Sequence, residues 1–173
     1  MTDEPYRVSV VCWGNICRSP MGEFLLREAF DEAGLGDRVV VDSFGTSADE
    51  LGKGMHPRTA AVLRRNGHPD LGWSRHRARR INRDELDDVD LALPVDVEHV
   101  RGLERLARDD DDRAKIRLFR SFDPAAVAAG TLGMDDPWYG TDPAYEQTYR
   151  EITAAIPGIV EHVRAEIAAR NGG

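Results

Sequence analysis

The chain has 173 residues, of which 41% are hydrophobic and 31% charged, so it is long and apolar enough to bury the core of one domain. Its net charge of −8 argues against general binding to nucleic acid or to anionic membranes. It has no apolar run of the ~20 residues that a membrane span needs and no signal-peptide pattern, which predicts a cytoplasmic protein. We expect a single domain over residues 1–173, with its core at about 6–170, and a monomer.

Strand-like and helix-like segments alternate along the chain. The apolar run at 6–13 predicts a buried strand, and residues 20–33 predict a helix capped by Ser19. Further short apolar runs predict strands at 38–44, 90–94 and 115–122. Further helices are predicted at 57–66, 97–108 and 145–170. Pro157 lies inside the last of these and should kink or divide it. Alternating strands and helices predict an α/β fold, in which a small four-stranded parallel sheet is flanked by helices on both faces.

The loop between the first strand and the first helix carries residues with clear chemistry. It reads CWGNICRSP at 12–20, and its glycine and asparagine accept unusual backbone angles. Such a loop can turn backbone N–H groups inward and, with the positive end of the helix, bind a phosphate dianion. Cys12 could then attack phosphorus as a thiolate, while the planar guanidinium of Arg18 holds two phosphoryl oxygens. The alternative interpretation has Cys12 as a small buried side chain and Arg18 on the surface.

This loop resembles the phosphate-binding loop of the bacterial, cysteine-dependent low-molecular-weight protein tyrosine phosphatases. Three further segments are similar to motifs of that family, in the family's order: DSFGT at 42–46, HRAR at 76–79 and DPWY at 136–139. The resemblance covers roughly residues 6–165. It implies a hydrolase of phosphotyrosine in proteins or peptides that needs no metal and no other cofactor.

The resemblance also implies roles for individual residues. Cys12 is the nucleophile of a two-step phosphocysteine mechanism, and Arg18 binds the phosphoryl group. Asp136 is the general acid and base, with Asp135 as an alternative by proximity. The family's substrate and phosphate site matches the remaining loop residues and two downstream rings: Trp13, Gly14, Asn15, Ile16, Cys17, Ser19, Trp138 and Tyr139.

Two more residues, Ser43 and His76, match partners that hold the loop asparagine in the family, and we expect this network to preform the loop. Cys17 is the family's second loop cysteine. It is either a small packed side chain or one half of a reversible disulfide with the nucleophile. The segment 67–75 is longer than the family pattern, and its Trp73 has no assigned role.

Other functions on the same scaffold remain to be weighed. Protein arginine phosphatases resemble this loop but carry threonine where Ile16 stands. Arsenate reductases of this fold need further cysteines downstream, and none follows Cys17. A non-catalytic module that binds phosphotyrosine or an oxyanion would need neither a nucleophile nor an acid, yet Cys12, Arg18 and Asp136 are all present.

Overall fold

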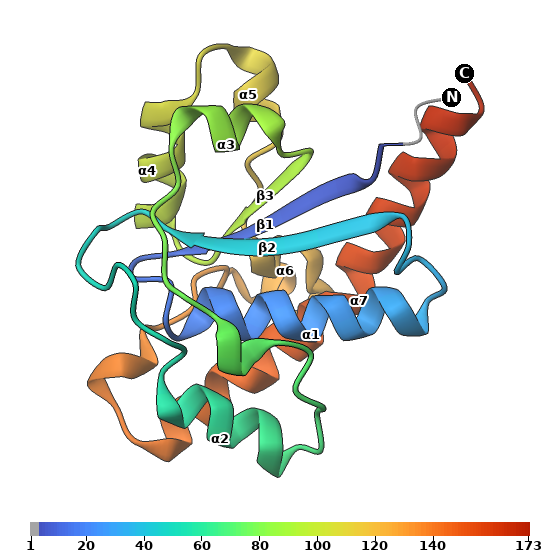
Figure 1. Ribbon diagram of the computed structural model, residues 1–173. Coiled ribbons are helices and arrows are strands. Elements are labelled where there is room, and N and C mark those ends of the chain that lie inside the picture. Colours follow the sequence, from blue (N-terminus) through green and yellow to red (C-terminus); the bar gives the residue numbers. More distant parts are fainter. Residues whose placement is uncertain (1–3) are drawn as a thin grey trace.

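The computed structural model describes residues 4–173, and its centre is a three-stranded parallel sheet (Figure 1). Strand β1 (Tyr6–Cys12) lies between β2 (Val39–Gly45) and β3 (Leu91–Pro94), and Cys12 pairs with Gly45 in the β1–β2 register. The chain passes from the central strand to one edge and later crosses to the other edge. Connections therefore diverge at the carboxyl end of β1, the position where α/β sheets bind their ligands.

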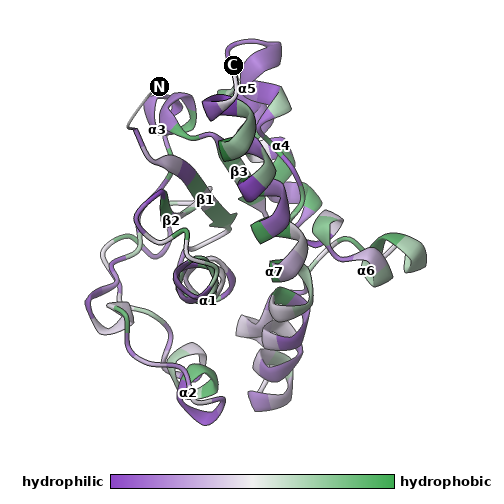
Figure 2. Ribbon diagram, turned by 90° about the vertical axis from the view of Figure 1, so that its right-hand side faces the viewer, coloured by the Kyte–Doolittle hydropathy of each residue, from purple (hydrophilic) through white to green (hydrophobic). Residues whose placement is uncertain are grey.

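Helices cover both faces of the sheet, as predicted (Figures 1 and 2). One face packs on α1 (Arg18–Glu32) and α7 (Asp142–Asn171), with α2 (Pro57–Arg65) against both helices, and the other face packs on α3 (Arg83–Asp88) and α4 (Val97–Leu106). Because side chains alternate along a strand, Val8 and Val10 enter the larger core beside α1 and α7. Val11 enters the smaller core, with Leu86 of α3 and Leu103 of α4.

The predicted fourth strand at 115–122 is wrong. Ile116 makes a single parallel bridge with Ala92, and the chain then turns into a short 3₁₀ helix. The hydroxyl and the N–H of Ser121 both donate to the Leu118 carbonyl, at 2.6 and 2.9 Å. This local turn uses the backbone acceptor that a longer ladder would have needed. The α/β class with a parallel sheet is confirmed, with three strands instead of four.

Several helix boundaries also differ from the prediction. Helix α1 begins at Arg18, and its N-cap is Cys17 instead of Ser19. Helix α7 runs through Pro157 as one helix and is not divided there. Three short helices were not predicted: α3, α5 (Asp110–Ala114) and α6 (Pro124–Ala129). Trp73, which had no assigned role, is 3% exposed and belongs to the larger core.

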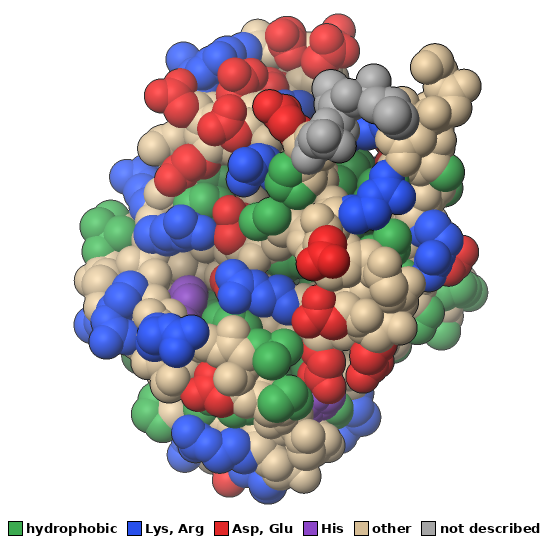
Figure 3. Space-filling model, turned by 45° about the vertical axis from the view of Figure 1, so that its right-hand side comes forward, with side chains coloured by type: hydrophobic (Ala, Val, Ile, Leu, Met, Phe, Trp, Pro, Cys, Tyr) green, Lys and Arg blue, Asp and Glu red, His purple; other side chains and the backbone are tan. Residues whose placement is uncertain are grey.

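The surface carries both signs of charge. On the face shown in Figure 3, acidic and basic side chains are intermixed, and acidic ones gather at the end of the molecule that holds α3 and α5. Within residues 4–173, no helix combines the length and the apolar character that crossing a membrane requires. An anionic substrate must therefore be held by a local site, because the overall charge repels it.

Candidate active site

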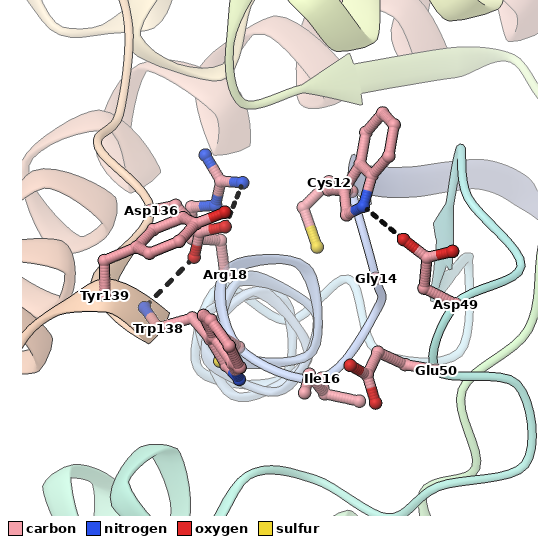
Figure 4. A pocket seen from close by; sticks show the side chains of 11 residues that line it. Cys12, Gly14, Ile16, Arg18, Asp49, Glu50, Asp136, Trp138 and Tyr139 are labelled. Carbon is pink, nitrogen blue, oxygen red and sulfur yellow. Dashed lines mark hydrogen bonds and ion pairs between the residues drawn. The ribbon is translucent and has the colours of Figure 1, made fainter.

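The carboxyl end of β1 opens into a cavity of about 160 Å³ (Figure 4). The residues that line it come from the β1–α1 loop, the segment after β2 and the segment before α7: Cys12, Trp13, Gly14, Ile16, Cys17, Arg18, Asp49, Glu50, Asp136, Trp138 and Tyr139. Residues predicted from opposite ends of the chain are thus brought together. Asp49 and Glu50 were not predicted as site residues. Four predicted residues do not line the cavity: Asn15, Ser19, Ser43 and His76.

The sulfur of Cys12 is the candidate nucleophile. Cys12 ends β1 and is 3% exposed, and Figure 4 shows its sulfur pointing into the cavity. The backbone N–H of Asn15 donates to Sγ at 3.3 Å, and the Ser19 hydroxyl lies 2.9 Å from it. Donors placed around a sulfur stabilise its negative charge, so this environment suits a thiolate.

Asn15 holds the loop in its curved form. Its φ of 61° is the only positive φ of a non-glycine residue within 4–173. Its side-chain amide donates to Ser19 Oγ at 2.8 Å and to Ser43 Oγ at 2.9 Å, and its Oδ1 accepts the Arg79 N–H at 3.0 Å. Its carbonyl accepts from His76 Nε2 at 2.7 Å. Four hydrogen bonds thus offset the strain of the left-handed backbone and preform the loop.

A buried carboxyl group extends this network. Glu23 lies one turn after Ser19 on α1 and is 4% exposed. Its Oε1 accepts from the Ser43 hydroxyl at 2.6 Å, and its Oε2 pairs with Arg27 at 2.6 Å. Burial raises the pKa of Glu23 above its ordinary value, while Arg27 and the Ser43 hydrogen bond oppose that rise. Sequence reasoning missed Glu23; the available signal was a glutamate four residues after a loop serine.

A close backbone contact explains the glycine of the DSFGT motif. A Cβ on Gly45 would lie 2.5 Å from the Trp13 carbonyl oxygen, so only glycine fits. The next two residues fix the loop from the same side: the N–H of Thr46 donates to the Cys12 carbonyl and that of Ser47 to the Trp13 carbonyl, both at 2.9 Å. The end of β2 thereby holds the start of the loop.

The loop also presents backbone donors. Within residues 4–173, no acceptor receives the N–H of Gly14, Ile16 or Cys17. These groups precede the first turn of α1, where the helix dipole adds a partial positive charge. The arrangement matches an anion-binding loop at a helix N-terminus.

Arg18 and Asp136 meet at one side of the cavity. Arg18 is 2% exposed; its Nη1 donates to the Met134 carbonyl at 2.8 Å, and its Nη2 lies 3.4 Å from Asp136 Oδ2. The other oxygen of Asp136 accepts the Trp138 N–H at 3.1 Å, at the start of the 3₁₀ helix Pro137–Tyr139. A guanidinium and a carboxyl group therefore face the cavity opposite the sulfur (Figure 4).

Aromatic rings form the mouth of the cavity. Trp13, Trp138 and Tyr139 are 46%, 53% and 83% exposed, and the last two pack edge to face with centroids 5.1 Å apart. The indole N–H of Trp13 donates to Asp49 at 3.0 Å, which fixes that ring. Exposed rings beside an anion site suit a ligand with an aromatic body and a charged end.

Cys17 is packed deeper than Cys12. It is 4% exposed, and its sulfur lies 3.5 Å from Tyr145 Oη. Burial raises the pKa of the Cys17 thiol to about 12, so this sulfur stays protonated at neutral pH. Both cysteines are free thiols. In this state Cys17 is a small packed side chain and a poor nucleophile.

Comparison with known proteins agrees with this geometry. Residues 7–169 match the family model described as low molecular weight phosphotyrosine protein phosphatase. A low molecular weight protein-tyrosine-phosphatase of Streptomyces coelicolor is 43% identical over 95% of this chain and 98% of that protein. Low molecular weight protein-tyrosine phosphatase A of Mycobacterium tuberculosis is 37% identical, with 98% of each chain covered. A crystal structure of a protein tyrosine phosphatase from Entamoeba histolytica has the same fold, with a TM-score of 0.85 at 20% identity over 93% of this chain and 98% of that one.

Proposed function

This chain belongs to the low molecular weight protein-tyrosine-phosphatase family and is an enzyme of that class, and on that premise we propose that it hydrolyses phosphotyrosine through a covalent phosphocysteine on Cys12. The observation that carries the proposal is the meeting of Cys12, Arg18 and Asp136 around one cavity with aromatic rings at its mouth. The substrates are tyrosine-phosphorylated proteins or peptides. The phosphate enters the loop, and the phenyl ring lies between Trp13 and Tyr139.

In the first step the Cys12 thiolate attacks phosphorus in line with the tyrosyl oxygen. The S–P bond forms as the P–O bond breaks, and Asp136 transfers its proton to the departing oxygen. The phosphoryl dianion takes the place of Asp136 on Arg18, whose two parallel N–H groups match two phosphoryl oxygens. The Asp136 carboxyl is thereby released toward the leaving group.

In the second step water attacks the phosphocysteine. The Asp136 carboxylate accepts a proton from the water as the S–P bond breaks. Inorganic phosphate is released, and the Cys12 thiolate is regenerated. The Ser19 hydroxyl, 2.9 Å from Sγ, donates to the departing sulfur. The loop N–H groups and Arg18 neutralise the phosphoryl charge in both steps.

The fold and the chemistry support two wider proposals. Residues 6–170 work as one phosphatase domain, because the site needs the β1–α1 loop and the segment before α7 together. The enzyme works in the cytoplasm, where reducing conditions keep the catalytic thiol free.

The phosphocysteine can be trapped directly. A rapid denaturing quench during turnover of an aryl phosphate, followed by peptide mass spectrometry, should find one phosphoryl group on Cys12. Cys12→Ser should carry none and show no turnover, yet still bind inorganic phosphate, because Arg18 and the loop N–H groups survive. Cys17→Ser is the matched control and should keep the adduct on Cys12.

A phosphoryl group on Cys17, or turnover by Cys12→Ser, would contradict the mechanism. Phosphotyrosine, phosphoserine and phosphoarginine peptides, assayed side by side, test the substrate class. We expect phosphotyrosine to be hydrolysed far faster than the other two. Preference for phosphoarginine would instead favour a protein arginine phosphatase.

A further inference from the structure

A buried histidine on α4 has no role in the mechanism above. His99 is fully buried, and within residues 4–173 neither of its ring nitrogens has a hydrogen-bond partner. Glu98 Oε1 lies 3.1 Å from Nε2, but the geometry is not that of a hydrogen bond. Burial, with a contribution from the charge of Arg18, lowers the pKa of His99 to about 3, so the ring is neutral at pH 7. A neutral imidazole offers one acceptor nitrogen, and leaving it unused in the interior is costly.

The residue that caps the start of α4 contacts the segment that supports Arg18. Asp96, three residues before His99, packs against Gly133: its carboxylate lies 3.0 Å from where a Gly133 Cβ would be. Gly133 precedes Met134, whose carbonyl accepts from Arg18 Nη1 at 2.8 Å. This side of α4 therefore faces the support of the catalytic arginine.

The next turn of the same helix contacts the segment that holds Cys12. Gly102, three residues after His99, lies so close to Thr46 that a Cβ would be 2.9 Å from its Cγ2. The N–H of Thr46 donates to the Cys12 carbonyl at 2.9 Å. His99 thus lies on α4 between a contact with the Arg18 support and a contact with the Cys12 support.

Arg18 has hydrogen-bonding capacity that its protein partners do not use. Its guanidinium carries five N–H groups. Met134 O accepts from Nη1, Asp136 faces Nη2, and the buried Nε has no partner within residues 4–173. Two N–H groups suffice for a bidentate grip on a phosphoryl group. At least one donor remains for a neighbour that orients the guanidinium from behind.

We propose that His99 is a positioning residue for Arg18, in which the imidazole holds a guanidinium N–H through one bridging water. A water between them satisfies two buried groups that otherwise lack partners, one a donor and one an acceptor. The guanidinium is then held from α4 as well as from Met134, with its remaining edge turned to the phosphate. This proposal rests on the phosphate-binding role of Arg18 proposed above.

Two substitutions separate positioning from packing. His99→Gln keeps a side-chain acceptor, whereas His99→Met has similar bulk and lacks a comparable one. The affinity for inorganic phosphate, measured by calorimetry, should fall about tenfold in His99→Met, the scale of one lost hydrogen bond to a charged group, with a lower kcat as well. His99→Gln should stay within about threefold of wild type. A purely structural role would lower Tm in both variants and leave phosphate affinity unchanged.

Arg18→Lys supplies the coupling test. In that background His99→Met should have little further effect on phosphate affinity, because the group that it orients is gone. Equal losses in both backgrounds, or wild-type affinity in His99→Met, would overturn the proposal. If His99→Met does not fold, the ring ¹⁵N signals of His99 decide in the full-length enzyme. They should shift on Arg18→Lys if the proposal holds and stay unchanged if it does not. Failure of the wild-type enzyme to bind phosphate would contradict the proposed function instead.

Discussion

At the scale of single residues, Asn15 joins conformation to chemistry. Its positive φ turns the loop around the cavity, and its side chain and carbonyl bind four partners from three parts of the chain. In the proposed mechanism Ser19 also donates to the departing sulfur, whereas Ser43, His76 and Arg79 act only by holding the loop. We therefore expect substitutions at Asn15 to act on phosphate affinity and on stability together.

Two substitutions at Asn15 distinguish backbone strain from lost hydrogen bonds. Asn15→Gly keeps the positive φ without strain but loses the side-chain bonds, whereas Asn15→Ala loses the bonds and adds about 1–2 kcal/mol of left-handed strain. Both variants should bind phosphate more weakly, and urea unfolding should show Asn15→Ala to be less stable by about that difference. Wild-type phosphate affinity in Asn15→Gly would mean that the side chain does not preform the loop.

The sequence predicted the site residues that lie in short motifs and missed those that lie between them. The loop and the DPWY segment carry their side chains in adjacent residues, so spacing and resemblance sufficed to predict that the two segments meet at one cavity. Glu23, Asp49 and His99 have no such local pattern. Their roles depend on which segments pack beside them, and only the folded chain shows that.

At the scale of elements, the wrong prediction of a fourth strand and the close packing of α7 both involve the segment before α6. The segment at 115–122 has the apolar alternation of a strand, but the local bonds of Ser121 turn it into a 3₁₀ helix after one bridge. Helix α7 then packs on that turn. A Cβ on Gly158 would lie 2.2 Å from the Phe122 carbonyl oxygen, so the helix approaches the turn to backbone contact. Pro157 is followed by the glycine that permits this approach.

Gly158→Ala tests this packing. Because the contact is with backbone, the helix or the turn must shift, and we expect a loss of about 1–3 kcal/mol in the free energy of unfolding. Gly172→Ala is the matched control: its Cβ would meet only the Ala168 carbonyl oxygen, at 3.5 Å, an ordinary contact. Thermal and urea unfolding should separate the two variants. A Gly158→Ala protein as stable as wild type would show that α7 has room at this position.

At the scale of the whole molecule, the fold brings the proposed acid, Asp136, and the proposed nucleophile, Cys12, to one cavity from distant parts of the chain. Two arginines hold the segment 134–140, which contains Asp136. Arg18 donates to the Met134 carbonyl at one end, and Arg58 of α2 donates to the Gly140 carbonyl at the other, each at 2.8 Å. The order of strands and helices predicted the α/β class with its parallel sheet. It did not predict these long-range anchors, because each joins residues that share no local pattern.

In the proposed mechanism Asp136 protonates the leaving group while Cys12 attacks phosphorus. Asp136 lines the cavity, whereas its neighbour Asp135 is exposed and is not among the lining residues. Asp136→Asn keeps size and hydrogen bonding but cannot donate the proton, so kcat for phosphotyrosine should fall by about 10²–10⁴. Asp135→Asn is the matched control and should have a much smaller effect.

The most direct measurement is log kcat against the pKa of the leaving phenol, for wild type, Asp135→Asn and Asp136→Asn on a series of aryl phosphates. A phenol that is already acidic departs with little protonation, so a missing acid matters most for the least acidic phenols. If Asp136 is the acid, the slope is shallow for wild type and Asp135→Asn, and steep and negative for Asp136→Asn alone. A steep slope in Asp135→Asn would assign the acid to that residue, and three parallel lines would contradict protonation by either aspartate.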